Sequence, residues 1–285
     1  MKLEGRRTSD NVDDRRRSGK TTATLGIGGL IVVGIITWLM GGNPLEVLTG
    51  TLSNVMQTGT GTEHVPTARE DSMATFASTI LAGTEDVWTK EFEKMGRKYV
   101  PPKMVLFPGA TNSGCGSASS QTGPFYCPTD QTLYIDLSFF DQMSNQLGAG
   151  GDFACAYVIA HEVGHHVQNL LGTLDKVHQM QSRVSKKESN QLSVRLELQA
   201  DFYAGIWAYY DNKMFNSLEE SDIEKGLNAA SAIGDDRLQM QAQGYTVPDA
   251  FNHGTSAQRV RWLKKGATTG RIADGDTFSP DYSSL

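Results

Sequence analysis

The sequence predicts an α+β fold, in which a mostly helical domain with a small sheet is preceded by one N-terminal transmembrane helix. Three observations support this prediction. Apolar residues recur at helical spacing in several long segments, short β-branched and aromatic runs lie between them, and one uncharged stretch is long enough to span a membrane. The chain has 285 residues, which is enough for one substantial core with appendages.

The first forty residues predict a basic head followed by a membrane anchor. Residues 1–20 hold seven Lys and Arg against four Asp and Glu, a net charge of +3. Residues 23–40 carry no charge, and a helix of this length spans about 27 Å, close to the hydrocarbon thickness of a bilayer. We expect an uncleaved anchor here, and a cleaved signal peptide is the alternative. The predicted domains are then 1–22 (cytoplasmic head), 23–40 (anchor), 41–66 (linker) and 67–285 (folded body).

Charge and cysteine usage predict where the body lies. Positive charge before the anchor predicts a cytoplasmic N-terminus and an extracytoplasmic body in a single-pass protein of the cytoplasmic membrane. After residue 20 the chain holds 19 basic and 28 acidic residues, a net charge of −9, which gives no support to nucleic-acid binding. Cys115 and Cys127 flank a Gly/Ser-rich loop, which suits a disulfide in an oxidising space, with a metal site as the alternative. Cys155 lies among apolar residues and is expected to be a buried thiol.

The body alternates between helical and extended patterns. Apolar residues recur on common faces across residues 67–96, which predicts a helix that ends before Pro101 and Pro102. Residues 104–107 and 132–137 are predicted strands, and the cysteine-bracketed loop lies between them. Further helices are expected over 152–171, 190–210 and 218–243, and from Thr255 or Ser256 onward.

The helix predicted over 152–171 carries the motif with the most chemical content, His161-Glu162-Val163-Gly164-His165. Histidines four residues apart project from one face of a helix, so both imidazoles can bind one zinc ion, and Glu162 is placed to activate water. Because this helix is mostly apolar, its polar side chains require partners, and a metal ion is one such partner. His166 points about 100° away from His165, so we expect a surface or supporting residue there and not a ligand.

A third protein ligand is expected from the second apolar helix. Catalytic zinc sites usually have three protein ligands and an open position for water. Glu197 and Asp201 lie four residues apart and share a helix face, so we expect Glu197 to bind zinc and Asp201 to accept a hydrogen bond from a ligand histidine. An ordinary solvated face is the alternative, and the apolar neighbours argue against it. His64 and His178 lie in polar or charged segments and are weaker candidates.

Seven segments spread along nearly the whole chain resemble a family of bacterial neutral zinc metallopeptidases that are membrane-anchored. The resemblance implies a zincin-like domain with a glutamate ligand, Zn²⁺ as the cofactor and a protein or peptide as the substrate, at the bacterial inner membrane. It defines the site more closely than the substrate, and it leaves the oligomeric state open. The segments are GRRTSDNV (5–12), SGCG (113–116), GPFYCP (123–128), YID (134–136), AHEVGHHVQ (160–168), ELQAD (197–201) and HGTSAQR (253–259).

These residues predict metal-assisted hydrolysis of peptide bonds. Zinc held by His161, His165 and Glu197 would lower the pKa of a bound water. Glu162 would take the proton of that water during attack on the scissile carbonyl and pass it to the leaving nitrogen. The alternative is a non-catalytic, membrane-anchored binding module that retains a zinc pocket, and the position of Glu162 beside His161 argues against it.

Two further features of the predicted site concern the substrate. A donor from the protein normally stabilises the developing oxyanion, and we predict His253 in this catalytic role, with Arg259 and Tyr126 as further candidates. For Arg259, a structural ion pair is the alternative. A peptide is expected to bind as an added strand at a sheet edge near the metal, formed by residues 125–126 or 134–136, although a core hairpin explains these residues equally well.

Overall fold

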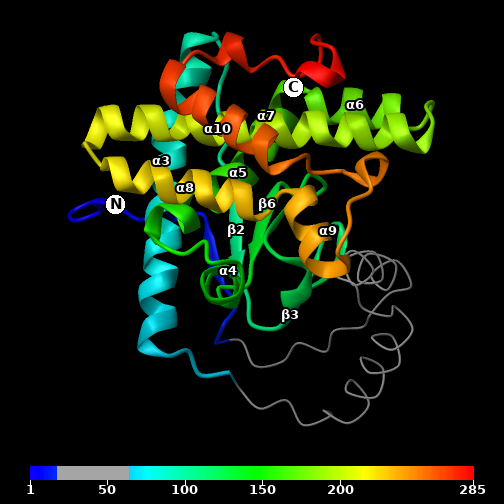
Figure 1. The fold of residues 1–285 in the computed structure, drawn as a ribbon. Coiled ribbons are helices and arrows are strands. Elements are labelled where there is room, and N and C mark those ends of the chain that lie inside the picture. Colours follow the sequence, from blue (N-terminus) through cyan, green and yellow to red (C-terminus); the bar gives the residue numbers. More distant parts are fainter. Residues whose placement is uncertain (18–63) are drawn as a thin grey trace.

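The computed structural model describes residues 1–17 and 64–285, in which helices surround and extend beyond a small sheet (Figure 1). This confirms the predicted α+β class. The α-helices of the described part are α3 (Ala68–Lys94), α4 (Ser138–Leu147), α5 (Asp152–Leu171), α6 (Thr173–Gln181), α7 (Lys186–Phe215), α8 (Glu220–Ala232), α9 (Asp235–Gln243) and α10 (Ser256–Thr269). The strands are β1 (Val12–Asp14), β2 (Lys103–Leu106), β3 (Ala110–Ser113), β4 (Gly116–Ser119), β5 (Phe125–Cys127) and β6 (Thr132–Ile135).

The main sheet has four strands in the order β1-β2-β6-β5. Strand β2 runs parallel to β1 and β6, whereas β5 runs antiparallel to β6 and ends the sheet. The two predicted strands, β2 and β6, are the inner pair, which explains their nearly continuous apolar sequences. Met104 pairs with Leu133 and Leu106 with Ile135, and all four side chains are fully buried. Strands β3 and β4 form a separate antiparallel hairpin.

Helix α5 lies at the centre of the helical part and packs against α3, α7 and α8. Figure 1 shows α7 and α10 stacked across one end of the molecule, with the sheet on the other side of α5. Every side chain from Phe153 to Gly164 is buried, so α5 has no solvent-facing stripe along this stretch. The apolar run that predicted this helix therefore reflects burial on all sides.

Side-chain caps define where several helices begin. Helix α10 starts at Ser256, and Thr255 is its N-cap in a capping box with Gln258. The predicted helix over 218–243 is instead two helices, α8 and α9, with a break at Gly234. A Cβ atom on Gly234 would lie 2.3 Å from the backbone nitrogen of Ser256, so the break lets the chain approach the start of α10. This close contact between distant segments left no signal in the local helical pattern.

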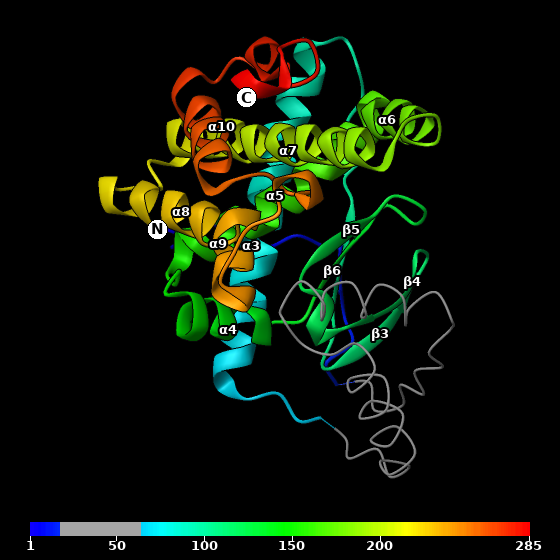
Figure 2. The same ribbon diagram turned by 45° about the vertical axis from the view of Figure 1, so that its right-hand side comes forward.

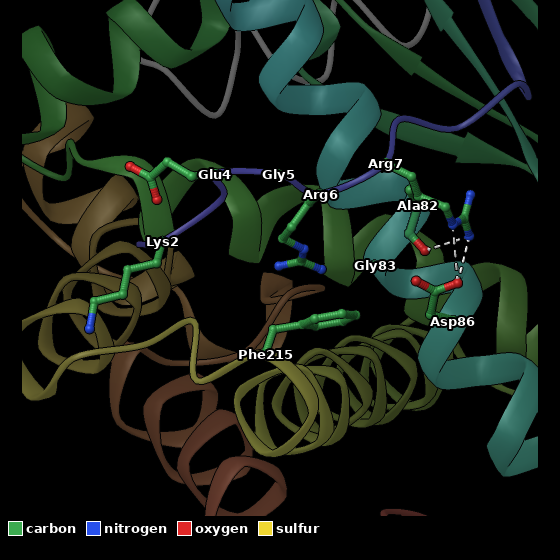
Figure 3. Close-up of a pocket in the computed structure, with 9 residues that line it drawn as sticks. All are labelled: Lys2, Glu4, Gly5, Arg6, Arg7, Ala82, Gly83, Asp86 and Phe215. Carbon is green, nitrogen blue, oxygen red and sulfur yellow. Dashed lines mark hydrogen bonds and ion pairs between the residues drawn. The ribbon is translucent and has the colours of Figure 1, made fainter.

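The N-terminal residues 1–17 are part of the folded body and do not stand apart from it as the head was predicted to do. Strand β1 pairs with β2, with Val12 opposite Met104. Arg6 makes a two-pronged ion pair with Asp211 of α7, which is fully buried. Figure 3 shows this segment along a shallow pocket, with Arg6 directed toward Phe215 and Arg7 bonded to Asp86. Several basic residues of the N-terminal segment therefore pair with acids of the body.

These contacts correct the predicted localisation. A single membrane-spanning helix places its two flanking segments on opposite sides of the bilayer, whereas residues 1–17 and 64–285 share one sheet and buried ion pairs. Within these two described ranges, no helix has both the length and the apolar character needed to cross a membrane. The predicted anchor, residues 23–40, lies outside the described residues. The predicted localisation, a single-pass membrane protein with a cytoplasmic N-terminus and an extracytoplasmic body, is therefore wrong. Positive charge that forms tertiary ion pairs was taken as a topology signal.

The segment between β2 and β6 is more ordered than the predicted loop. It contains the β3–β4 hairpin and β5, which are tied together by a disulfide between Cys115 and Cys127 with a Cα–Cα distance of 5.8 Å. Cys155 is a buried free thiol, and desolvation raises its pKa to about 12. Cys155 is therefore a packing residue with no reactive thiolate at neutral pH.

Candidate metal centre

The site forms where α5 and α7 cross, and Gly164 is what allows the crossing. A Cβ atom on Gly164 would lie 2.9 Å from the carbonyl oxygen of Ala200 and 3.1 Å from its Cα atom. Both contacts are with backbone, so no rotamer change could relieve them. The glycine inside the histidine motif thus sets how closely the two helices approach, and residues on their facing sides meet.

At this crossing, His161 and His165 of α5 face Glu197 of α7. The Nε2 atom of His161 lies 3.1 Å from Oε2 of Glu197, and Nε2 of His165 lies 3.3 Å from Oε1. One ligand atom from each of the three side chains falls within 4.8 Å of the others. In the part of the chain that the structure describes, this is the group of side chains that could hold a metal ion.

The donor set and its spacing fit zinc. Zn–N and Zn–O bonds of about 2.0–2.2 Å place the ligand atoms of a tetrahedral site about 3.3–3.6 Å apart. The two imidazoles lie 3.1 and 3.3 Å from different oxygens of the Glu197 carboxylate, which is close to that spacing, and the set of one ligand atom per side chain lies within 4.8 Å. Two imidazoles and one carboxylate suit zinc better than magnesium or calcium, which prefer oxygen ligands alone. Three protein ligands leave the fourth position for water or substrate.

The other ring nitrogen of His161 is held by a buried ion pair. Its Nδ1 atom lies 2.8 Å from Oδ1 of Asp201, which is fully buried. Arg259 from α10 donates to both oxygens of that carboxylate, from Nε at 2.8 Å and from Nη2 at 2.9 Å. The hydroxyl of Tyr157 donates to Oδ1 of Asp201 at 2.6 Å. Of the two alternatives for Arg259, the structure shows the ion pair.

Electrostatics at this position favour a positive charge. Burial alone would lower the pKa of His161, but the carboxylates of Asp201 and Glu197 outweigh it and raise the pKa to about 10. Burial would raise the pKa of Asp201, yet the charges of Arg259 and His161 hold it below its usual value. Glu197 is likewise held well below its usual value, because its two histidine neighbours outweigh desolvation. The same carboxylates would stabilise a bound cation.

Glu162 lies beside the ligands and is buried, with 8% of its surface exposed. Desolvation raises its pKa, while the neighbouring histidines and a hydrogen bond from the backbone of Tyr126 act in the opposite direction. Tyr126 is in β5, so the strand that ends the sheet lies against the metal-site helix (Figure 2). Of the two predicted edge segments, residues 125–126 are at the edge and residues 134–136 belong to or follow the inner strand β6.

His253 is held in place by the first residue of α9. Its Nδ1 atom lies 3.1 Å from Oδ1 of Asp235, and its backbone nitrogen donates to Oδ2 at 2.7 Å. Desolvation would lower the pKa of His253, but the bond to Asp235 and the charge of Glu197 raise it overall. About half of the side chain, 45%, is exposed, so the ring faces solvent near the carboxylate of Glu197.

Tyr126 and His166 form a separate buried pair. The hydroxyl of Tyr126 lies 3.0 Å from Nδ1 of His166 and accepts a bond from Asn169 at 2.9 Å. The Nε2 atom of His166 lies 2.8 Å from the carbonyl oxygen of Val100. Desolvation lowers the pKa of His166 to about 4, so this ring is neutral. His166 is therefore a buried structural residue, and the Tyr126 hydroxyl is engaged away from the metal site.

Sequence reasoning missed three residues that shape the site. Tyr157 supports Asp201, Asp235 holds His253, and Gln168 bonds Nδ1 of His165 through its side-chain oxygen at 2.9 Å. Gln168 follows His165 by three residues and so shares its helix face, which was the available signal. Tyr157 precedes His161 by four residues and shares its helix face, which is a signal of the same kind. No local pattern marks Asp235, because its partner His253 is 18 residues away.

Comparison with known proteins places the chain in a family. A family model described as "Putative neutral zinc metallopeptidase" matches residues 1–278. The chain belongs to this family. It is 50% identical to "Uncharacterized protein YpfJ" of Escherichia coli K12, over 98% of this chain and 99% of that protein. It is also 47% identical to "Uncharacterized protein Rv2575" of Mycobacterium tuberculosis, over 64% of each chain. No solved structure matches it significantly.

Membership confirms the resemblance drawn from the seven sequence segments. The match covers residues 1–278, which include the N-terminal segment and the residues of the metal centre. Family and geometry together support a zinc-containing hydrolase, with His161, His165 and Glu197 as the group that could bind the metal.

Proposed function

We propose that the protein is a zinc-dependent peptidase that hydrolyses peptide bonds with Glu162 as general base. The observation that carries this proposal is the convergence of two imidazole Nε2 atoms on one carboxylate, with a second, buried carboxyl group beside them. A site that only stores or displays zinc has no need for that second group. A buried carboxyl group without an ion-pair partner is costly, which argues for a chemical role.

Protein partners orient the candidate ligand residues. Zinc bound there would supply a Lewis acid that makes water more acidic and polarises a carbonyl group. His161 and His165 present Nε2 because Asp201 and Gln168 engage their Nδ1 atoms. Glu197 completes the set from the neighbouring helix. Such second partners of ligand histidines hold the ring orientation and increase ligand basicity.

Glu162 would move the proton. Burial moves the pKa of Glu162 toward neutral pH, which makes its carboxylate a stronger base. The carboxylate would accept a proton from the attacking water and later release it to the leaving nitrogen. The backbone bond from Tyr126 fixes the position of this carboxylate relative to β5. General base and sheet edge are thus held together by one contact.

His253 would stabilise the oxygen of the scissile carbonyl. Asp235 engages its Nδ1 atom, so Nε2 remains as the second ring donor when the imidazole is charged. The ring is half-exposed and close enough to Glu197 to respond to its charge. A charged donor placed where negative charge develops lowers the barrier to acyl transfer.

The substrate would bind as an additional strand on β5. This strand ends the sheet in the described part of the chain, and the backbone of Tyr126 donates a hydrogen bond to the side chain of Glu162. The edge strand β5 therefore lies beside the proposed general base. An extended peptide bonded along that edge would present a backbone carbonyl to the site, with little dependence on its side chains.

The proposal is tested with the full chain, because residues 1–17 are part of the folded body. Glu162→Gln preserves shape and the zinc ligands, so it should retain zinc and lose casein hydrolysis by about 10²–10⁴-fold. His161→Ala should lose zinc and activity together. Zinc content is measured by elemental analysis, and digestion is followed with and without a chelator. Undiminished hydrolysis by Glu162→Gln would refute the mechanism.

A binding module that retains the zinc pocket is the second candidate function, and three protein ligands beside an exposed histidine are compatible with it. The same assay separates the two. A binding module would bind zinc and would show no chelator-sensitive hydrolysis in the unmodified chain. Peptidase activity that a chelator removes and added zinc restores would exclude it.

A further inference from the structure

The two histidines of the metal centre have unlike partners. Nδ1 of His161 faces the carboxylate of Asp201, whose charge is balanced by Arg259. Nδ1 of His165 faces the neutral amide of Gln168, with its oxygen at 2.9 Å. The side chain of Gln168 is fully buried, so no solvent competes for these bonds. An acid at this position would add another buried negative charge, and the amide avoids that cost.

The orientation of the Gln168 amide follows from its other partner. Its Nε2 atom donates to the carbonyl oxygen of Leu196 at 2.7 Å. A backbone carbonyl only accepts hydrogen bonds, so the nitrogen of the amide must face Leu196 and the oxygen must face His165. Because that oxygen also only accepts, Nδ1 of His165 must carry the hydrogen. Nε2 of His165 is then left with its lone pair directed toward Glu197.

A second amide reinforces this direction. Gln168 also donates to the side-chain oxygen of Gln199 at 3.2 Å. Gln199 in turn donates through its own nitrogen to the carbonyl oxygen of Gly275 at 3.0 Å. Two backbone carbonyls, those of Leu196 and Gly275, thus set the direction of every bond in the series. The series ends on the imidazole ring of His165, and each of its hydrogen bonds can point in one direction only.

The same side chain links the two helices that supply the ligands. Gln168 belongs to α5, and its acceptor Leu196 immediately precedes Glu197 in α7. One amide therefore holds the ring of His165 on one helix and the backbone beside Glu197 on the other. Removing it would release a ligand from each helix.

We propose that Gln168 is a positioning residue that holds His165 in the Nδ1–H tautomer and ties it to the backbone beside Glu197, and that it thereby sets the affinity of the site for zinc. This inference rests on the proposed zinc site. It concerns metal binding alone, and its test requires no substrate.

The test compares zinc dissociation constants of the full chain, measured by competition with a chromophoric chelator. Gln168→Met keeps the size of the side chain and removes both bonds, so zinc should bind about 10–100-fold more weakly, as when other supporting partners of metal ligands are lost. Gln239→Met is the matched control. It removes a buried glutamine of α9 that is bonded to the backbone nitrogen of Val247 and lies outside this series, so zinc affinity should stay close to that of the unmodified chain.

A third variant separates positioning from general packing. Gln168→Glu keeps an acceptor for His165 and loses the donor to Leu196. Its zinc affinity should lie between those of Gln168→Met and the unmodified chain, while its urea midpoint, measured without metal, falls as in Gln168→Met. If Gln168→Met does not fold, Gln168→Asn replaces it, because the shorter side chain withdraws the acceptor from His165.

Two results would overturn the inference. One is equal zinc affinity in Gln168→Met and the unmodified chain. The other is an equal loss of affinity in Gln168→Met and Gln239→Met, which would indicate packing alone. A chain that binds no zinc before any substitution refutes the proposed function as well, whereas wild-type binding with an unaffected Gln168→Met refutes only this inference.

Discussion

The ion pair between Asp201 and Arg259 gives the most quantitative prediction for this protein. Asp201 is fully buried and 2% of Arg259 is exposed, so replacing the arginine with methionine leaves a carboxylate without its main counter-charge. Breaking a buried pair in this way costs about 3–5 kcal/mol. His161 still faces the carboxylate and its pKa is raised to about 10, so an imidazolium compensates in part. We therefore expect Arg259→Met to lower the free energy of unfolding by about 3 kcal/mol, the lower end of that range.

The assay is urea unfolding of the full chain at neutral pH in the presence of a chelator, which removes metal binding from the comparison. Arg271→Met serves as the control, because the side chain of Arg271 is 74% exposed in its pair with Asp274 and surface pairs contribute about 0–1 kcal/mol. Adding Asp201→Asn to Arg259→Met should recover part of the loss, since a neutral amide needs no counter-charge. A loss of less than about 1 kcal/mol in Arg259→Met would refute this account of the buried pair.

Three other predictions concern the crossing, the N-terminal segment and the disulfide. Gly164→Ala places a methyl group against the backbone of Ala200, so it should lower the free energy of unfolding by about 1–3 kcal/mol and weaken zinc binding. Unchanged zinc affinity would contradict the role given to the helix crossing. Deleting residues 2–17 removes strand β1 and also Arg6, the partner of the buried Asp211, so the protein should show no cooperative unfolding transition in urea. A cooperative transition like that of the unmodified chain would contradict the structural role of this segment. Replacing Cys115 and Cys127 together with serine opens a loop of 12 residues and should lower the free energy of unfolding by about 2–3 kcal/mol. Under reducing conditions the difference between this variant and the unmodified chain should vanish.

Local patterns predicted the parts of this fold whose signals are local. The helix over 152–171 and the inner strands were visible because burial on all sides leaves continuous apolar runs. The spacing of His161 and His165 required only that the segment be helical. Glu197 and Asp201 were identified by the same rule on a second helix, one turn apart.

The errors arose where a local signal had two physical explanations. Arginines near the N-terminus were taken as a membrane-topology signal, and the structure pairs Arg6 with Asp211 and Arg16 with Asp71 instead. The helical pattern over 218–243 continued through Gly234, where a close approach to α10 breaks it. In both cases the deciding partner lies more than twenty residues away, beyond the reach of any periodicity.

The sequence by itself identified the side chains that could hold a metal ion, because two helical repeats of four residues carry both histidines and both acids. Tertiary structure alone decided how those helices meet. The approach of Gly164 to Ala200 brings the two faces together, and Arg259 and Gln168 then orient the rings. The physical reason is that helical periodicity is a property of consecutive residues, whereas hydrogen-bond direction and ion pairing depend on which distant segments are packed side by side.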